Sequence, residues 1–433
     1  MSTAWTVLED AHLRDRLFCT QLPDGPAVYV LPKPGFTKTH AALAVRFGSL
    51  DTRYRPRGAR DVRRVPDGLA HFLEHQMFAQ EDGDAFERFA ALGASANAHT
   101  TYSATTYLFT ATDGTVAALE HLLDFVQQPH FTDAGTDKER GIIQQEIRMY
   151  DDDPGWRLQR LVTSGLYREH PCRVDIAGTV ETVAEITTAI LRECHELFYH
   201  PANMVLAVVG AMEPDEVLEH ASAWLGRHAR GTWREPERVS PTEPDGVAQI
   251  RAEDRMAMAR PLVALAFKDR QVPAWGRAQL ERDLLTDIGL AATFGPTSDR
   301  FRGWYESGLI DRGFRAGYLG EATFALSELA GETDRPDELV EALRAAALEI
   351  RRDGVDAAAC ERQRRARMGE FVRFFDIPEA LGNLLPQLHF NKIGPLEFQD
   401  VLEGVSAEAV SRRLAEHLDP DLATSAILRP TRG

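Results

Sequence analysis

The feature of this chain that most limits its fold is a pattern of elements that occurs twice. In residues 105–126, a run rich in aromatic and β-branched residues leads through a turn into an amphipathic helix. Residues 322–350 have the same order of strand, turn and long helix. The apolar strands 204–212 and 422–430 come near the ends of the two halves. This repetition predicts two α+β domains of similar topology.

The chain has 433 residues, more than a single hydrophobic core usually supports. The segment from about Arg230 to Asp245 is rich in proline and has no apolar periodicity, so it is the best linker candidate. We therefore expect an N-terminal domain in residues 1–228, a linker in 229–246 and a C-terminal domain in 247–433.

Composition excludes several classes of function. The net charge of −17 argues against a nucleic-acid partner, which needs a concentrated basic surface. The longest apolar run, 204–212, is too short to cross a membrane, and the N-terminus has no apolar segment of signal-peptide length. The four cysteines form no CxxC pair, which is typical of free thiols in a reducing compartment. We expect a cytoplasmic protein without a membrane partner.

The stretch GLAHFLEHQMF, residues 68–78, carries the candidate chemistry. In a helix, His71 and His75 are one turn apart on one face and can bind the same zinc ion. Glu74 reaches the edge of that site, where its carboxylate could accept a proton from a water molecule. A catalytic zinc site needs a third protein ligand from another part of the chain.

A predicted helix from about Thr136 to Tyr150 supplies two candidates for this ligand. Glu139 and Glu146 are two turns apart on the same face, so spacing alone does not choose between them. The glutamate that is not the ligand could orient one of the ligand histidines without binding the zinc ion itself. Glu139 also has a structural alternative, because Thr136 and Glu139 have the spacing of a helix capping box.

The simpler alternatives concern chance and surface residues. With 14 histidines, one HxxEH match can arise by coincidence, and such histidines can be ordinary surface residues. The remaining histidines, such as His130, His170 and His389, show no spacing typical of a metal site. The sequence contains no GxSxG, GxxxxGK[ST] or GxGxxG motif that would indicate another catalytic chemistry.

Several motifs together resemble the insulinase (pitrilysin-type) family of zinc peptidases with an inverted HxxEH motif. After GLAHFLEH come GASANAHTTYSATTYLF, KERGIIQQEIRMYDDDP and YHPANMVLAVVG, in the order and separation of that family. In length the chain is similar to the half-size members, which include bacterial proteins like the mitochondrial processing peptidase subunits. The resemblance implies two similar α+β domains, each with a mostly antiparallel sheet packed against helices.

The resemblance also implies roles for individual residues and one Zn²⁺ ion per chain. His71, His75 and Glu146 match the zinc ligands, Glu74 the general base, and Glu139 an acidic residue that supports the site. Two residues, Asn97 and Ala98, match the edge-strand segment that holds the substrate backbone. An exposed sheet edge can bind an extended peptide as an added strand. Asn97 could instead be a turn residue near the start of a strand.

One part of the family pattern is missing. Family members often carry an Arg and a Tyr seven residues apart that contact the substrate carbonyl, and here Trp304 and Asp311 occupy those positions. Arg302 and Tyr305 are nearby but out of register. The sequence therefore predicts a zinc endopeptidase that works as a heterodimer with a related subunit carrying the Arg/Tyr pair, or as a homodimer. The alternative is a structural or assembly subunit with a vestigial zinc site.

Overall fold

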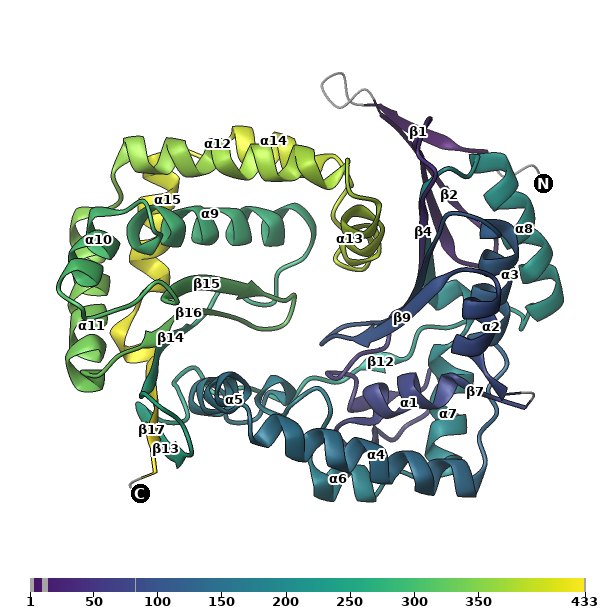
Figure 1. The fold of residues 1–433 in the computed structure, drawn as a ribbon, viewed down its shortest axis with the longest axis horizontal. Coiled ribbons are helices and arrows are strands. Elements are labelled where there is room, and N and C mark those ends of the chain that lie inside the picture. Colours follow the sequence, from purple (N-terminus) through teal and green to yellow (C-terminus); the bar gives the residue numbers. More distant parts are fainter. Residues whose placement is uncertain (1–3, 10–14, 82, 432–433) are drawn as a thin grey trace. The chain divides into compact units, whose positions relative to one another are not determined.

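The computed structural model describes residues 4–9, 15–81 and 83–431. The chain forms two compact units (Figure 1). Unit 1 contains the described residues up to Ile147, together with residues 175–240 and 372–390. Unit 2 contains residues 148–174 and 241–371 and the described residues from Asn391 onward.

The centre of unit 1 is a seven-stranded sheet in the order β1-β2-β3-β11-β4-β10-β9. β11 pairs in parallel with β3, and the other neighbours pair antiparallel. β11 is buried along its whole length, as expected for the apolar, β-branched sequence MVLAVVG. The strands are β1 (Thr6–Glu9), β2 (Arg16–Gln21), β3 (Ala27–Pro32), β4 (Thr39–Val45), β9 (Ser95–Thr100), β10 (Thr105–Ala111) and β11 (Met204–Gly210).

Helices of unit 1 bury their apolar faces in one large core against this sheet. Leu73 of α1, Leu122 of α3 and Leu206 of β11 all belong to that core. The helices and the short 3₁₀ turn are α1 (Leu69–Met77), α2 (Ala85–Ala91), α3 (Thr115–Phe125), α4 (Asp133–Asp151, in unit 1 up to Ile147), α6 (Val180–Ala184), α7 (Thr188–Phe198), η2 (Pro201–Asn203) and α8 (Pro214–His228).

Two small sheets complete unit 1. The strands β5 (Arg53–Arg55), β6 (Arg63–Arg64) and β12 (Glu237–Arg238) form one, and β7 (Ala79–Gln80) pairs with β8 (Gly83–Asp84) in the other. β12 lies inside the segment expected to be a linker, so part of that segment is ordered against β5. One of the breaks between the two units falls after Ser240, inside this segment.

Unit 2 repeats the central part of unit 1. Its five-stranded sheet has the order β13-β17-β14-β16-β15, which corresponds to β3-β11-β4-β10-β9 of unit 1. β13 pairs in parallel with β17, as β3 does with β11. This confirms the prediction of two similar α+β units with mostly antiparallel sheets packed against helices. The strands are β13 (Arg251–Met256), β14 (Leu262–Lys268), β15 (Arg315–Gly320), β16 (Ala325–Glu332) and β17 (Ala423–Pro430).

The helices in the second half of the chain follow the same order as those in the first half. Several helices of unit 2 contribute to a separate apolar core. The helices of this unit are α5 (Pro154–Leu166), α9 (Gly276–Phe294), α10 (Asp299–Glu306), α11 (Pro336–Asp353), α12 (Ala357–Phe374, in unit 2 up to Phe371), α14 (Glu397–Glu403) and α15 (Ala407–His417), with the 3₁₀ turns η1 (Pro171–Arg173) and η3 (Pro420–Leu422).

Each half of the sequence gives one helix to the other unit. α5 comes from the first half and packs on β13, β14 and β17 of unit 2. α13 (Pro378–Phe390) comes from the second half and packs on β4 and β11 of unit 1. The compact units therefore do not follow a single cut in the sequence. The expected domain boundaries on either side of a linker in residues 229–246 stay a prediction.

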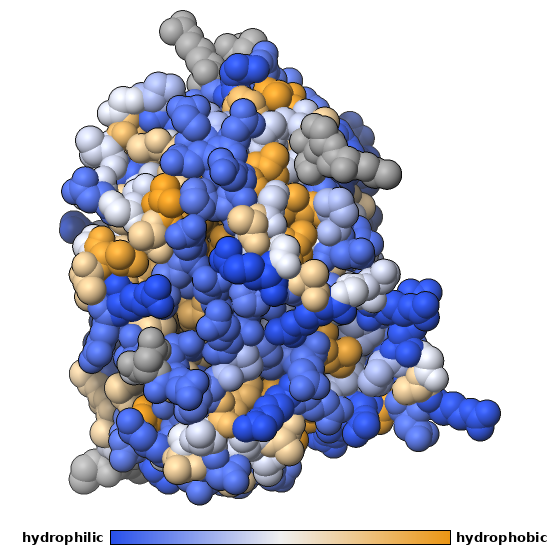
Figure 2. Space-filling model, turned by 90° about the vertical axis from the view of Figure 1, so that its right-hand side faces the viewer, coloured by the Kyte–Doolittle hydropathy of each residue, from blue (hydrophilic) through white to orange (hydrophobic). Residues whose placement is uncertain are grey.

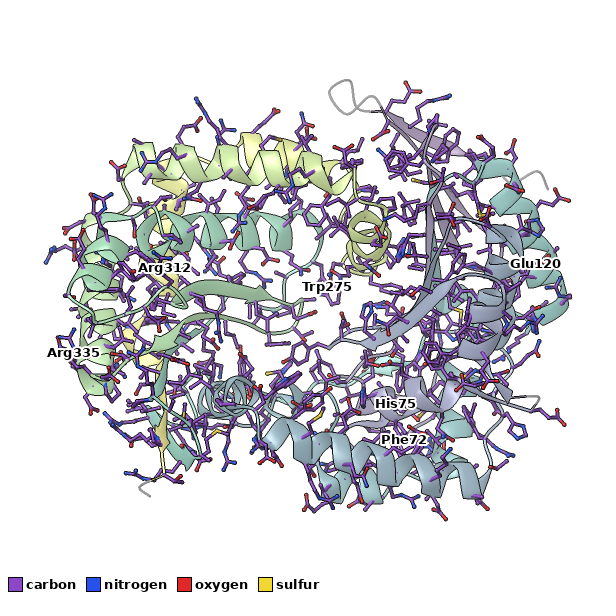
Figure 3. The ribbon with its side chains drawn as sticks, in the orientation of Figure 1. Phe72, His75, Glu120, Trp275, Arg312 and Arg335 are labelled. Atoms are coloured by element: carbon purple, nitrogen blue, oxygen red, sulfur yellow. The ribbon has the colours of Figure 1, made fainter. Side chains whose placement is uncertain are left out.

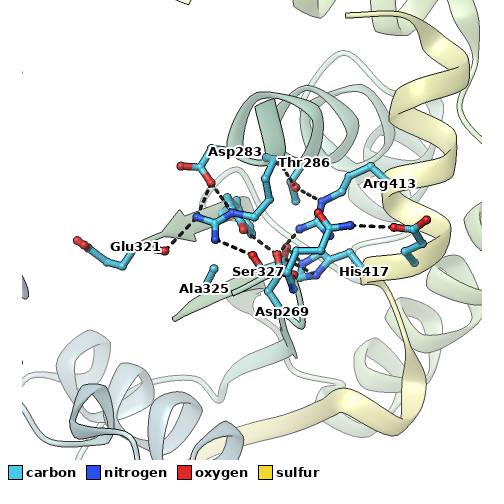
Figure 4. A network of polar contacts seen from close by, with 12 residues as sticks. Asp269, Asp283, Thr286, Glu321, Ala325, Ser327, Arg413 and His417 are labelled. Carbon is cyan, nitrogen blue, oxygen red and sulfur yellow. Dashed lines mark hydrogen bonds and ion pairs between the residues drawn. The ribbon is translucent and has the colours of Figure 1, made fainter. Parts of the chain in front are cut away.

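A buried polar network lies in unit 2 (Figure 4). Asp269 accepts hydrogen bonds from Arg413 and from the Tyr318 hydroxyl, and the Ser327 hydroxyl lies 2.5 Å from Nε2 of His417. Burial works against the charged form of Asp269, but His417 and Arg413 hold its pKa at about 2. Ser327, His417 and Asp269 are each at most 2% exposed, so this network is structural.

The face of the molecule in Figure 2 is largely hydrophilic, with hydrophobic residues scattered in small groups. Such scattered apolar residues are normal on a protein surface. In the described part of the chain, we find no helix with the length and apolar character needed to cross a membrane.

Candidate metal centre

α1 places two histidines on the side of the helix that does not enter the core. Phe72 and Leu73 are fully buried, whereas His71 and His75 keep partial exposure and their ring centroids are 4.5 Å apart. His75 and Phe72 are labelled on this helix in Figure 3. The HxxEH spacing thus brings two imidazoles together, because residues four apart stack on an α-helix.

The start of α1 depends on Gly68. Its backbone has φ 89°, and a Cβ atom there would lie 2.4 Å from the carbonyl oxygen of Ala177. A residue with a side chain would therefore be both strained and obstructed at this position. The close approach anchors the helix that carries the histidines.

α4 brings Glu146 to the same place. Ile143 and Ile147 bury one side of this helix. Glu146 Oε1 lies 3.8 Å from Nε2 of His71, and its Oε2 lies 3.6 Å from Nε2 of His75. Of the two glutamates that spacing could not separate, Glu146 is the one that faces both Nε2 atoms.

Glu139 lies on the other side of the His75 ring. Its Oε1 atom is 2.8 Å from Nδ1 of His75, so that N–H can donate a hydrogen bond to the carboxylate. The helix begins at Asp133 rather than near Thr136, and Thr132 accepts a hydrogen bond from the Gly135 N–H. Thr136 therefore lies inside the helix, and the capping-box alternative for Glu139 is wrong.

The arrangement fits a zinc ion. One donor atom from each of His71, His75 and Glu146 can be chosen so that all three lie within 4.8 Å of one another, and no other such group occurs among the described residues. Tetrahedral zinc with bonds of about 2.1 Å would hold its ligand atoms about 3.4 Å apart. The separations of 3.6 and 3.8 Å are close to that value. The hydrogen bond at Nδ1 of His75 leaves the lone pair of its Nε2 atom free to bind the metal.

The charges around the two histidines differ. Burial and the neighbouring His75 lower the pKa of His71 to about 4, which keeps it neutral. Burial also acts against the charged form of His75, but the hydrogen bond to Glu139 and the carboxylates of Glu74, Glu139 and Glu146 raise its pKa overall. A cation is therefore favoured beside these three carboxylates.

Glu74 lies beside the histidines and is 7% exposed. Burial raises the pKa of its carboxyl group. The hydroxyl of Thr100 in β9 donates a hydrogen bond to Oε2 of Glu74 at 2.5 Å. Sequence reasoning did not identify Thr100, because only the packing of β9 against α1 brings the two residues together.

β9 is the last strand of its sheet, so in the described part of the chain one of its edges has no neighbouring strand. Thr101 N donates to Ala104 O at the turn that leads to β10. Because hydrogen-bonded pairs alternate along antiparallel strands, the backbone groups that face the free edge are those of Ala96, Ala98 and Thr100.

Asn97 and Ala98 lie in the middle of this strand. The side chain of Asn97 accepts a hydrogen bond from the Ala98 N–H at 2.9 Å. That N–H therefore points away from β10 and is covered only by an exposed side chain. The turn that was an alternative for Asn97 is not seen, since its residue pairs with Leu108 inside the strand.

In unit 2, Trp304 and Asp311 have structural contacts. Trp304 packs beside Phe294 and Phe314. Asp311 accepts a hydrogen bond from Gly313 N at 2.8 Å and pairs with Arg260. Neither side chain carries the guanidinium or the phenol hydroxyl that an Arg/Tyr pair would supply.

The nearby Arg302 and Tyr305 are also in unit 2. Arg302 forms an exposed ion pair with Asp299 at 3.4 Å. Tyr305 is 41% exposed, and the guanidinium of Arg312 lies over its ring.

Comparisons with known proteins show the family to which the chain belongs. Residues 57–180 match the family model described as Insulinase (Peptidase family M16), and residues 185–367 match the one described as Peptidase M16 inactive domain. Over 417 residues the chain is 37% identical to the uncharacterized zinc protease YmfH of Bacillus subtilis (strain 168), covering 96% of this chain and 97% of that protein.

Solved structures of peptidases also resemble this chain. An M16-like peptidase from Alicyclobacillus acidocaldarius superposes with a TM-score of 0.92 at 34% identity, over 98% of this chain and 100% of that one. Pitrilysin has a TM-score of 0.75 at 19% identity, and the match covers 100% of this chain but 47% of pitrilysin, which indicates a shared fold. The chain belongs to the insulinase family of peptidases, family M16.

Proposed function

We propose that this protein is a zinc-dependent endopeptidase that hydrolyses peptides or unfolded polypeptide segments. The observation that carries the proposal is the convergence of His71, His75 and Glu146 beside the buried carboxylate of Glu74. Two imidazoles and one carboxylate are the donor set of a catalytic zinc site that keeps a position open. Similarity to proteins named zinc proteases supports the same reading.

The residues of the site would divide the work. One zinc ion held by the three ligands would lower the pKa of a bound water and polarise the peptide carbonyl. Glu74 would accept a proton from the attacking water and deliver it to the departing amine nitrogen. Its raised pKa suits this exchange, because a base must also give the proton up again. Glu139 would hold the ring of His75 in the orientation that presents Nε2.

We further propose that β9 binds the substrate as an added strand. The outward backbone groups of Ala96, Ala98 and Thr100 can pair with an extended peptide whatever its side chains are. A substrate strand would replace Asn97 as the partner of the Ala98 N–H. This mode of binding suits an enzyme that acts on unfolded segments.

We infer that a second subunit completes the site. The positions of the missing Arg/Tyr pair hold Trp304 and Asp311, which make structural contacts in unit 2. The same observation favours a second candidate function, a non-catalytic assembly subunit of this fold.

We also propose a cytoplasmic location. Three of the four cysteines are buried and all four are free thiols, as is usual in a reducing compartment.

Peptide hydrolysis by the purified chain tests the first function against the second. The chain should cleave members of a mixed peptide library, lose this activity with a chelator and regain it with added zinc. Glu74→Gln should keep the zinc content near wild type and lower hydrolysis by at least about a hundredfold, the scale of losing a general base. Zinc-loaded protein that cleaves nothing, with or without a related subunit, would favour the assembly role.

A further inference from the structure

The side chain of Thr100 links the edge strand β9 to the carboxylate of Glu74. We infer that Thr100 is a positioning residue, which fixes the general base relative to a peptide bound along β9. This inference rests on the proposed function. It is carried by the hydrogen bond of 2.5 Å between the Thr100 hydroxyl and Oε2 of Glu74.

The direction of this hydrogen bond follows from the neighbouring hydroxyl. Thr105 donates its own hydrogen to the carbonyl oxygen of Phe47 at 2.9 Å. Thr105 therefore has no hydrogen left for Thr100, whose Oγ1 lies 3.4 Å away. The hydrogen of Thr100 is free to go to Glu74, the nearer and more basic acceptor.

The orientation of the Glu74 carboxylate depends on this hydrogen bond. Thr100 supplies the one hydrogen bond that it accepts within the described part of the chain. Rotation about the last bond of a glutamate side chain is broad in general, so a hydrogen bond to one oxygen narrows the orientations open to the carboxylate. With Oε2 engaged by Thr100, Oε1 has no hydrogen-bond partner among the described residues and is available for a proton.

The backbone of Thr100 adds a second function to the same residue. Its N–H and C=O groups face the free edge of β9, as those of Ala98 do. A peptide paired with this edge would be placed by the residue that also holds the base. Loss of the hydroxyl should therefore impair the chemical step more than the binding of the peptide.

The variant Thr100→Val removes the hydroxyl and keeps the branched shape of the side chain. We expect kcat to fall by about tenfold to a hundredfold, the scale of a small misplacement of a catalytic group, with KM within about twofold of wild type. Thr100→Ser should restore most of kcat. Thr106→Val is the matched control, because Thr106 lies on the next strand with its side chain on the opposite face of the sheet.

A second set of variants separates positioning from a purely structural role. In a Glu74→Gln background, Thr100→Val should have little further effect on kcat, because the base that it positions is already gone. Peptide binding to Glu74→Gln, measured by fluorescence anisotropy, should not change when Thr100→Val is added, and zinc content should stay the same. An unchanged kcat in Thr100→Val, or an equal loss in both backgrounds, would overturn the inference.

A crystal structure of Thr100→Val gives a readout that needs no activity. We expect the Glu74 carboxylate to occupy a new or a mixed orientation there. A single, unmoved orientation would refute the role of Thr100 even in a protein that cleaves peptides. Failure of the proposed function is recognised separately, as wild-type protein that binds zinc and hydrolyses nothing.

Discussion

The two ring nitrogens of His75 show how much one residue depends on its neighbours. Nδ1 is engaged by Glu139 at 2.8 Å, whereas Nε2 faces Glu146 at 3.6 Å. A hydrogen bond at Nδ1 selects the tautomer in which Nε2 carries a lone pair for a metal. The two glutamates of α4 therefore act on opposite sides of the same imidazole.

Neutral substitutions of these two glutamates should have different effects on zinc. Glu146→Gln should lose most of the bound zinc, because an amide is a poor ligand for this ion. Glu139→Gln should keep the site but weaken its zinc affinity by about tenfold to a hundredfold, the usual effect of losing a residue that hydrogen-bonds to a metal ligand. Competition with a chromogenic chelator measures both. Asp137→Asn on the exposed side of α4 is the control, and equal affinity in Glu139→Gln and this control would contradict the assignment.

Zinc binding should also depend on pH in a definite direction. The pKa of His75 is raised above its ordinary 6.5, so near neutral pH a fraction of the metal-free protein carries a proton on Nε2. That proton must leave before the nitrogen can bind zinc, so the apparent affinity should fall as the pH falls through this range. Glu139→Gln removes a cause of the raised pKa and should move this fall to lower pH. A titration of zinc affinity against pH that gives the same midpoint for both proteins would refute the argument.

At the scale of elements, β9 has two kinds of backbone position. The N–H of Asn97 takes part in the ladder with β10, whereas that of Ala98 faces the free edge. Proline is tolerated on an edge strand only where its missing N–H would have faced outward. The two adjacent positions should therefore respond differently to the same substitution.

Ala98→Pro should leave the protein folded and raise KM for peptides by about fivefold, since it removes one backbone hydrogen bond of about 1 kcal/mol to the substrate strand. Asn97→Pro should instead lower the melting temperature, because it removes a hydrogen bond from the β9–β10 ladder. Thermal unfolding and steady-state kinetics distinguish the two results. If Ala98→Pro leaves KM unchanged, the substrate does not pair with this edge.

At the scale of the whole molecule, this chain corresponds to about half of pitrilysin, of which it covers 47%. The family resemblance predicts the Arg/Tyr pair at the positions of Trp304 and Asp311, and these two side chains make structural contacts in unit 2. Loss of one donor to the developing oxyanion typically costs a factor of about 10² to 10³ in rate. A partner subunit that supplies such donors would therefore have a large effect.

We expect peptide hydrolysis to rise by about a hundredfold or more when this chain is mixed with a related subunit that has the Arg/Tyr pair and lacks HxxEH. Activity measured against the ratio of the two chains should reach its maximum at equal amounts. A self-dimer in which Arg302 or Tyr305 provides the donor would show activity that depends on the concentration of this chain alone. Full activity from a strictly monomeric chain, unchanged on mixing, would refute the need for a partner.

Much of the fold and part of the site follow from local sequence. The strand–turn–helix repeat predicted two similar units, because apolar periodicity reports which face of each element is buried. The HxxEH spacing predicted that His71 and His75 would share one face of a helix, since four residues make about one turn. These inferences needed only the geometry of a single element.

Tertiary structure decided what local geometry leaves open. Glu139 and Glu146 share a face of α4, so only the way that helix meets α1 puts one beside Nδ1 and the other beside both Nε2 atoms. The contact of Thr100 with Glu74 and the exchange of α5 and α13 between the units likewise join segments far apart in the chain. Periodicity along a sequence reports which face of an element is buried, but not which neighbour covers it.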